Sequence, residues 1–225
     1  KESYYEGLTS YPAARCVRIL NPLSADLNVM RQTLLFNTME AVQLNANRRN
    51  GNLRLYEFGN CYFYDEAARD AEKPLSSYSE QYRLAIAVTG AAVPQSWNAK
   101  PQASSFFTLR AVAEKLLRRF GLDIYALKCE PLQSDLFGDG ISLSAGNGRE
   151  LLQMGVVAPR IRRAFDLKQE VYYLEMNFDA LVKSTRKHRI AFEELSKFPE
   201  VKRDLALLVD RQVTFAQLRP IALAT

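Results

Sequence analysis

Short apolar segments separated by turn signals run through the whole sequence, and only a few stretches have the apolar period of a helix. Many strand-like segments with helices at only a few places are typical of an α+β fold. We therefore expect an antiparallel sheet flanked by helices. The expected strands are residues 15–20, 53–58, 61–64, 82–89, 124–129, 141–144, 151–157, 172–176 and 204–209, and short helices are expected at 159–165, at 179–183 and from residue 215.

The clearest helix is predicted at residues 105–120. Its apolar side chains fall on a single stripe, as expected for a helix that lies on one face of a sheet. Gly121 follows directly and is placed for a C-terminal cap. The stripe consists of Phe106, Leu109, Ala113, Leu116, Leu117 and Phe120.

A second helix is predicted at residues 28–47, and it has two apolar stripes. The main stripe is Leu27, Met30, Leu34, Leu35 and Val42. The second stripe, on roughly the opposite face, is Val29, Phe36 and Leu44. A helix that is apolar on two faces must be covered from both sides. The sheet supplies one cover. The other is a partner chain or the rest of the same domain, and periodicity alone leaves both open.

The composition is that of an ordinary globular domain, with 225 residues and 48% hydrophobic side chains. No apolar run approaches the length of a membrane span, and the N-terminus has no signal peptide pattern. The chain does not begin with Met, so we expect it to be a piece of a longer protein. Cys16, Cys61 and Cys129 are widely separated, which argues against a disulfide framework or a zinc site and fits a reducing cytoplasm.

The net charge is +5, and the basic residues occur in short clusters. One cluster spans residues 183–189 and includes Arg186, Lys187 and Arg189. Clusters this short are common on solvated surfaces, and they are also the residues that contact RNA phosphates. The three residues are therefore candidates for contact with RNA, with a solvated face as the alternative.

Catalytic patterns are missing from the sequence. His188 is the only histidine and lies among basic residues. The sequence therefore lacks the histidines that a zinc site usually needs, and His188 is poorly placed to act as the base of a Ser-His-Asp system. There is no P-loop, and the short Gly138-Asp-Gly140 and Gly146-Asn-Gly148 patterns precede no helix that could receive a phosphate. We expect a chain without catalytic, cofactor-binding or metal-binding residues.

Three motifs carry a resemblance to a known family. The first runs from Asn21-Pro-Leu-Ser24 into Met30-Arg-Gln-Thr-Leu-Leu35, and the second is Arg54-Leu-Tyr-Glu-Phe-Gly59. The third is Phe198-Pro-Glu-Val-Lys-Arg-Asp-Leu-Ala-Leu-Leu-Val-Asp210, near the other end. In this order they resemble the beta subunit of phenylalanyl-tRNA synthetase.

The resemblance implies a class II synthetase-like antiparallel sheet over residues 1–197, without catalytic residues. It also implies that residues 198–225 are the truncated start of a ferredoxin-like anticodon-binding domain. The helix at residues 28–47 would correspond to motif 1, through which alpha and beta subunits pack. On that reading Val29, Phe36 and Leu44 face the alpha subunit.

The same resemblance implies the chemistry of the whole complex. It would attach phenylalanine to its transfer RNA with ATP and magnesium, and the alpha subunit would carry that chemistry. A class II catalytic site uses a motif 2 arginine and a glycine-rich motif 3 with a second arginine. No such motif 3 follows the hairpin at residues 53–64.

Two other classes of function stay open. The first is a free-standing ATP-dependent amino-acid ligase of the same fold, and the missing motif 3 argues against it. The second is an RNA-binding module, which would need a continuous basic stripe with interleaved aromatic residues. The tyrosines of this chain are not interleaved with its arginine clusters.

Overall fold

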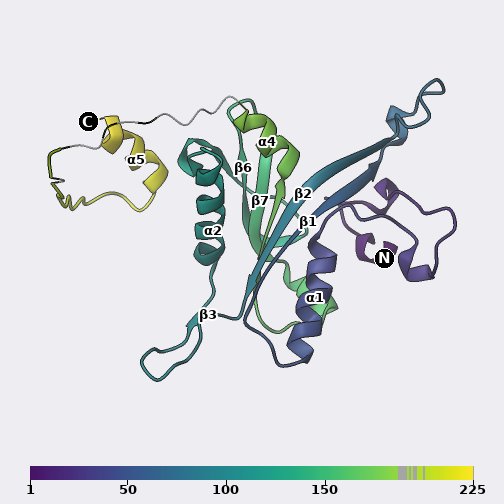
Figure 1. Ribbon diagram of the computed structural model, residues 1–225, viewed down its shortest axis with the longest axis horizontal. Helices are drawn as coiled ribbons and strands as arrows, with labels where there is room; N and C mark the ends of the chain where they lie inside the picture. The colour runs from purple at the N-terminus through teal and green to yellow at the C-terminus, as the bar shows by residue number, and fades with distance from the viewer. Residues whose placement is uncertain (187–191, 193, 195–196, 200, 225) are drawn as a thin grey trace. The chain divides into compact units, whose positions relative to one another are not determined.

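The computed structural model describes residues 1–186, 192, 194, 197–199 and 201–224, and the chain divides into two compact units, residues 1–187 and residues 188–225. The first unit contains a six-stranded sheet with strand order β1-β2-β8-β7-β6-β5 (Figure 1). Every neighbouring pair in it is antiparallel. The strands are β1 (Leu53–Tyr64), β2 (Tyr78–Thr89), β5 (Lys128–Pro131), β6 (Phe137–Ser144), β7 (Glu150–Val157) and β8 (Val171–Asn177). The predicted α+β class with an antiparallel sheet is confirmed.

A small hairpin and several helices complete the described chain. The hairpin follows β2 and consists of β3 (Ala91–Val93) and β4 (Gln102–Ala103). The α-helices are α1 (Leu35–Asn47), α2 (Phe106–Arg119), α3 (Pro159–Ala164), α4 (Phe178–Thr185) and α5 (Phe215–Ala224). The 3-10 helices are η1 (Glu2–Tyr5), η2 (Ala13–Arg15), η3 (Ala25–Leu27), η4 (Glu66–Ala68) and η5 (Ile124–Ala126). Within the described residues, no helix is both long enough and apolar enough to cross a bilayer.

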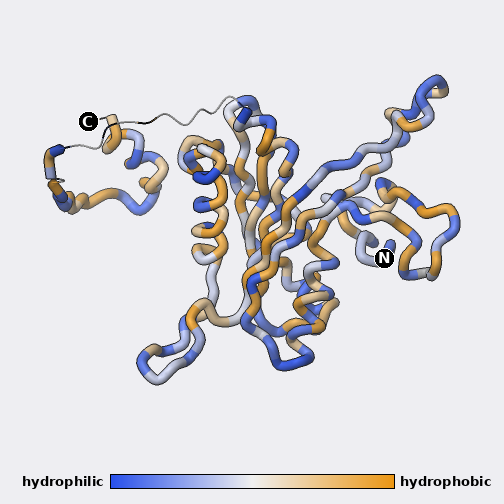
Figure 2. Tube along the Cα trace, in the orientation of Figure 1, coloured by the Kyte–Doolittle hydropathy of each residue, from blue (hydrophilic) through white to orange (hydrophobic). Residues whose placement is uncertain are grey.

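The two faces of the sheet have separate cores. On one, here called the α1 face, α1, α3 and the N-terminal segment bury apolar side chains against β1, β2 and β8. On the other, the α2 face, α2 and α4 cover the middle strands. Figure 1 shows α1 and α2 on opposite sides of the sheet. The loop between β1 and β2, residues 65–77, extends beyond the sheet and is hydrophilic at its tip (Figure 2).

The α2 helix agrees closely with its prediction. Leu109, Ala113 and Leu117 are buried on one stripe against the sheet. Gly121 has a φ of 77°, a left-handed conformation that favours glycine. The N–H of Gly121 donates to the Arg118 carbonyl and the N–H of Leu122 donates to the Leu117 carbonyl, both at 3.0 Å. This is the Schellman arrangement, which ends the helix as the sequence predicts.

The helix predicted at residues 28–47 is shorter than expected, because α1 begins only at Leu35. The preceding residues pair with the chain at residues 17–19, where Val29 forms a bridge with Arg18. The N–H of Met30 donates to the Val17 carbonyl at 2.8 Å. Backbone groups engaged in this bridge cannot also form helical hydrogen bonds. Residues 15–20 likewise form no strand beyond this single bridge.

The second unit contains α5, which begins at Phe215 as predicted. The strand expected at residues 204–209 is absent, and these residues have no regular secondary structure and are exposed. A strand needs a partner for its backbone groups, and no described segment pairs with this one. Whether residue 197 ends one domain and residue 198 begins another stays a prediction.

Candidate functional site

The predicted interface residues Val29, Phe36 and Leu44 do not form one exposed stripe, so that part of the prediction is wrong. Val29 precedes α1 and is 9% exposed. Phe36 is 4% exposed, and its ring stacks on Tyr4 at a centroid distance of 5.0 Å and meets Tyr5 edge-on at 5.3 Å. Only Leu44 is exposed, at 53%. The N-terminal segment of this chain supplies the second cover that the stripe needed.

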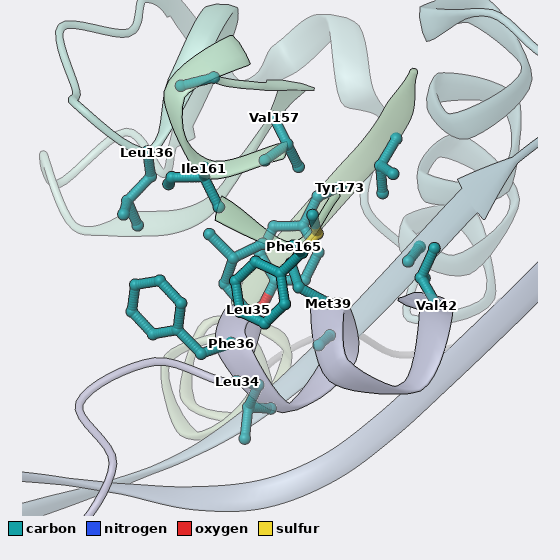
Figure 3. Packing of buried hydrophobic residues seen from close by; sticks show 14 of the residues in the cluster. Leu34, Leu35, Phe36, Met39, Val42, Leu136, Val157, Ile161, Phe165 and Tyr173 are labelled. Carbon is teal, nitrogen blue, oxygen red and sulfur yellow. The ribbon is translucent and has the colours of Figure 1, made fainter. Parts of the chain in front are cut away.

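The packing around α1 explains this outcome. Figure 3 shows Leu35, Phe36 and Met39 gathered with Phe165 and Tyr173 in the core of the α1 face. Fully burying one such side chain stabilises the fold by about 1.5–3 kcal/mol. Most apolar side chains of α1 are therefore buried in the core of this chain. Leu44 is the one large apolar residue of α1 that remains exposed.

The candidate RNA-contacting cluster is only partly described. Arg186 follows α4 directly and is exposed. Lys187 and Arg189, together with His188, lie outside the described residues. The position of Arg186 agrees with either a solvated face or a phosphate contact, so this assignment stays a prediction.

A buried ion pair lies on the α1 face and joins two neighbouring strands, β2 and β8. Arg83 of β2 and Glu175 of β8 form it through Nη1 and Oε1, and their side chains are 14% and 6% exposed. Glu175 Oε2 accepts hydrogen bonds from Thr33 Oγ1 at 2.5 Å, from the N–H of Leu34 at 3.1 Å and from the Tyr173 hydroxyl at 2.5 Å. This carboxylate therefore fixes the residues directly before α1, which explains why the helix starts where it does.

Tyrosines surround the ion pair and act as neutral donors or acceptors. Burial, together with the charge of Glu175, raises the pKa of Tyr11 to about 12 and raises the pKa of Tyr173 well above its ordinary value. Both phenols therefore keep their protons at neutral pH. Arg83 Nη1 donates to the Tyr11 hydroxyl at 3.0 Å. Gln81 Oε1 also accepts hydrogen bonds from Arg83 Nε at 3.2 Å and Nη2 at 2.8 Å, so the guanidinium is held by groups of this chain and stabilises the fold.

This cluster was not among the predictions made from the sequence, although the sequence contains a signal for it. Glu175 stands in the apolar strand Val-Tyr-Tyr-Leu-Glu-Met-Asn, where a buried carboxylate requires a partner. Arg83 is the matching cation in the strand that pairs with β8, but only the sheet topology makes the two neighbours.

Two of the sequence motifs meet at the edge of the sheet. Arg31, from the Met-Arg motif, pairs with Glu57 of β1 at 2.5 Å and donates through Nε to the Asn60 carbonyl at 3.0 Å. The N–H of Tyr62 donates to the Arg31 carbonyl at 2.8 Å. A Cβ at Gly59 would collide with the Arg31 guanidinium. The glycine of the second motif is therefore needed so that the arginine of the first can lie across β1.

The two arginines of the described strands both have hydrogen-bond partners within this chain. Arg54 and Arg83 are the only arginines in the described strands. Arg54 donates through Nη2 to the Ala92 carbonyl at 2.8 Å, and Arg83 is held by Glu175. Within the described part of the chain, no group of three His, Cys, Asp or Glu side chains is placed to hold a metal ion.

Comparison with known families matches residues 1–178 to the model of the phenylalanyl tRNA synthetase beta chain CLM domain. The whole chain is 45% identical over 225 residues to the phenylalanine–tRNA ligase beta subunit of Bacteroides thetaiotaomicron, of which it covers 27%. It is 39% identical over 220 residues to that of Porphyromonas gingivalis, covering 98% of this chain and 27% of the relative. The chain thus spans about a quarter of the length of the curated relatives it matches.

Comparison with solved structures gives the fold. The pyrrolysyl-tRNA synthetase of Desulfitobacterium hafniense superimposes with a TM-score of 0.57 at 13% identity, covering 81% of this chain and 58% of that one. A second structure of a pyrrolysyl-tRNA synthetase from this organism gives a TM-score of 0.54 at 15% identity, covering 76% and 53%. At these identities the likeness shows a shared architecture alone.

Proposed function

The chain belongs to the phenylalanyl-tRNA synthetase beta chain family, and we propose that it serves as a non-catalytic core that scaffolds the assembly of alpha and beta subunits. In this proposal the alpha subunit carries the chemistry that attaches phenylalanine to transfer RNA with ATP and magnesium. A cytoplasmic location is part of the same proposal.

The state of the two sheet arginines supports the proposal most directly. Phosphoryl and acyl transfer from ATP needs fixed positive charge aimed at the reacting phosphate. Arg83 instead faces Glu175 inside the core, and Arg54 is tied to a backbone carbonyl. The charge that a class II enzyme directs at ATP is used here to hold strands and a hairpin together.

We expect the chain to bind no ATP. Calorimetric titration of the 225-residue chain with ATP and magnesium should give only the heat of dilution, because Arg83 is held by Glu175 and no glycine-rich motif 3 follows the hairpin at residues 53–64. A micromolar dissociation constant would contradict the scaffold proposal. It would favour the second candidate, a free-standing ATP-dependent amino-acid ligase.

The alpha subunit is the partner we propose, with Leu44 as the contact from α1. Val29 and Phe36 are buried inside this chain. Of the three predicted interface residues, only Leu44 is exposed and available to a partner. An exposed leucine contributes little to the stability of its own domain. When a partner covers it, the buried apolar area stabilises the complex.

The Leu44→Asp variant should weaken association with the alpha subunit by at least about tenfold, since a charge would then face the partner. The melting temperature of the chain itself should stay within about 2 °C, as for most surface substitutions. Leu75→Asp is the matched control, because Leu75 is an exposed leucine in the loop between β1 and β2. Equal affinity of the two variants for the alpha subunit would remove Leu44 from the interface.

Transfer RNA specific for phenylalanine is the second partner we propose, bound in part through Arg186, Lys187 and Arg189. Replacing all three by Ala should reduce the slope of log affinity against log salt by about two to three, because each phosphate contact releases close to one counterion. The matched control replaces Lys115, Arg118 and Arg119, three exposed cations of α2. If both variants reduced the salt dependence of binding equally, the overall positive charge and not a specific site at these residues would bind the transfer RNA.

We also propose that residues 198–225 are the truncated start of the anticodon-binding domain. The exposed, unpaired segment at residues 204–209 supports this, because a ferredoxin-like unit needs more strands than these residues contain. A chain ending at residue 197 should therefore keep the melting temperature of the longer one. A fall of more than about 5 °C would place residues 198–225 in the first domain.

A further inference from the structure

An apolar groove lies on the α2 face of the sheet, between α2 and the edge strand β1. It has a volume of about 330 Å³. Strands β1 and β2 supply its floor, and α2 supplies one wall. The lining includes Tyr56, Phe58, Leu84, Ile86, Val112 and Leu116.

The helices of this face stop short of the sheet edge. Both α2 and α4 pack against β2, β7 and β8. β1 is the last strand on that side of the sheet, and its residues Tyr56 and Phe58 are 75% and 43% exposed. The Phe58 ring is held by its contacts with the rings of Tyr82 and Phe178, at centroid distances of 6.0 Å and 5.2 Å. A contiguous apolar surface of this kind marks an interaction site.

The width of the uncovered surface fits one more helix beside α2. A helix is about 10 Å across and strands are about 4.8 Å apart, so one helix covers about two strands. An extended peptide added to the edge of β1 would instead lie beyond the strand, in the plane of the sheet, and would leave the aromatic side chains uncovered. Part of that edge is also occupied already, because the Tyr62 N–H donates to the Arg31 carbonyl at 2.8 Å.

The rim of the groove is basic. Lys115 and Arg119 follow Val112 and Leu116 by three residues, so they lie on the same side of α2 and one position further out. Both side chains are exposed, and in the described part of the chain neither forms an ion pair. Arg54 lines the groove from β1. These cations favour a partner that carries carboxylates beside its apolar surface.

We propose that this groove binds an amphipathic α-helix of a partner protein, with acidic side chains flanking the apolar face of that helix. The apolar face packs on Tyr56, Phe58 and Leu116, and the carboxylates pair with Lys115 and Arg119. Apolar burial supplies the affinity, and the charges fix the orientation of the helix. The groove lies on the opposite face of the sheet from α1, so this inference goes beyond the scaffold role and does not rest on the proposed contact of α1.

The experiment is a titration of the 225-residue chain with a synthetic peptide of about 18 residues, with leucines on one helical face and glutamate and glutamine elsewhere. The amide NMR signals of Tyr56, Phe58 and Leu116 should shift with a dissociation constant of about 10–100 µM. The helical circular dichroism of the peptide should rise on binding. Shifts confined to other parts of the chain would contradict the proposal.

Two control peptides separate helix binding from charge and from general stickiness. One has lysine in place of every glutamate, and the other has a proline at its centre, which breaks the helix and keeps the charges. Each should bind at least about tenfold more weakly than the acidic peptide. If the proline peptide bound equally well, the occupant would not be a helix. If the lysine peptide did, the basic rim would have no role.

Variants test the assigned residues. Tyr56→Ala should weaken binding of the acidic peptide about tenfold, since it removes an aromatic ring from the floor of the groove. Phe107→Ala is the matched control, because Phe107 is 74% exposed and does not line the groove. The double variant Lys115→Glu/Arg119→Glu should bind the lysine peptide more tightly than the acidic one, a reversal that a folding defect cannot produce. Equal affinities of Tyr56→Ala and Phe107→Ala, or no reversal, would refute the site.

A second copy of this chain is the alternative occupant of the groove. Sedimentation of the chain by itself should show no self-association that Tyr56→Ala weakens. A dimer that dissociates in the Tyr56→Ala variant would mean that two copies cover this surface between them, and it would overturn the proposal of a separate partner.

Discussion

The Phe36→Asp variant is expected not to fold at 25 °C. Removing a buried phenylalanine ring costs about 3–5 kcal/mol, and burying an unpaired carboxylate adds several more. The free energy of unfolding of a domain is typically only about 5–15 kcal/mol. The two costs together are therefore comparable to the whole stability of the domain. The side chain contacts the rings of Tyr4 and Tyr5 and is only 4% exposed, so an aspartate there would be largely cut off from water. Far-ultraviolet circular dichroism and a thermal melt of the purified chain would measure the loss.

Leu44→Asp is the internal control for this result, because it places the same charge on the same helix at an exposed position. It should melt close to the unmodified chain. If Phe36→Asp melted there as well, Phe36 would be solvent-exposed, and the three-residue stripe predicted from periodicity would again be the best description of the interface.

The Glu175→Gln variant should lower the free energy of unfolding by about 3–5 kcal/mol. The substitution keeps the shape of the side chain but leaves the guanidinium of Arg83 buried without its counter-ion, which is the costly way to break a buried pair. The start of α1 should also loosen, since the Leu34 N–H and Thr33 Oγ1 lose a charged acceptor. Urea unfolding followed by fluorescence would give the change in free energy, and hydrogen exchange at Leu34 would report the local effect.

A double-mutant cycle separates the ion pair from the rest of the cluster. Adding Arg83→Met to Glu175→Gln removes the unpaired charge, so the double variant should be destabilised by less than the sum of the two single variants. Glu130→Gln is the surface control, because Glu130 pairs with Lys128 in an exposed position and should change stability by less than about 0.5 kcal/mol. Strict additivity of the two core substitutions would mean that Arg83 and Glu175 do not stabilise each other.

Local chemistry predicted the parts of the fold that depend on neighbours in the sequence. The α2 helix has one apolar stripe and a glycine at its end, so its position follows from a few consecutive residues. The central strands were located by their apolar pattern in the same way. The strand expected at residues 204–209 has the same pattern but no described partner, and a strand cannot satisfy its backbone alone.

The candidate interface shows where periodicity stopped being informative. Two apolar stripes on one segment correctly predicted that it packs on two sides. The pattern could not identify the residues that pack against the second stripe. The N-terminal residues Tyr4 and Tyr5 fill that place for Phe36, and Val29 is drawn out of the helix by its bridge to Arg18. Both contacts join segments whose meeting no local pattern encodes.

The sequence by itself determined the α+β class, the family and the motifs that carry it, because these depend on residue types at fixed short spacings. The tertiary structure alone decided what the motifs do. It placed Arg31 against Glu57 and Gly59, and it brought Glu175 within reach of Arg83 and of the residues before α1. The physical reason is that burial and charge pairing depend on which strands become neighbours. In this sheet β8, the last strand of the described chain, lies between β2 and β7.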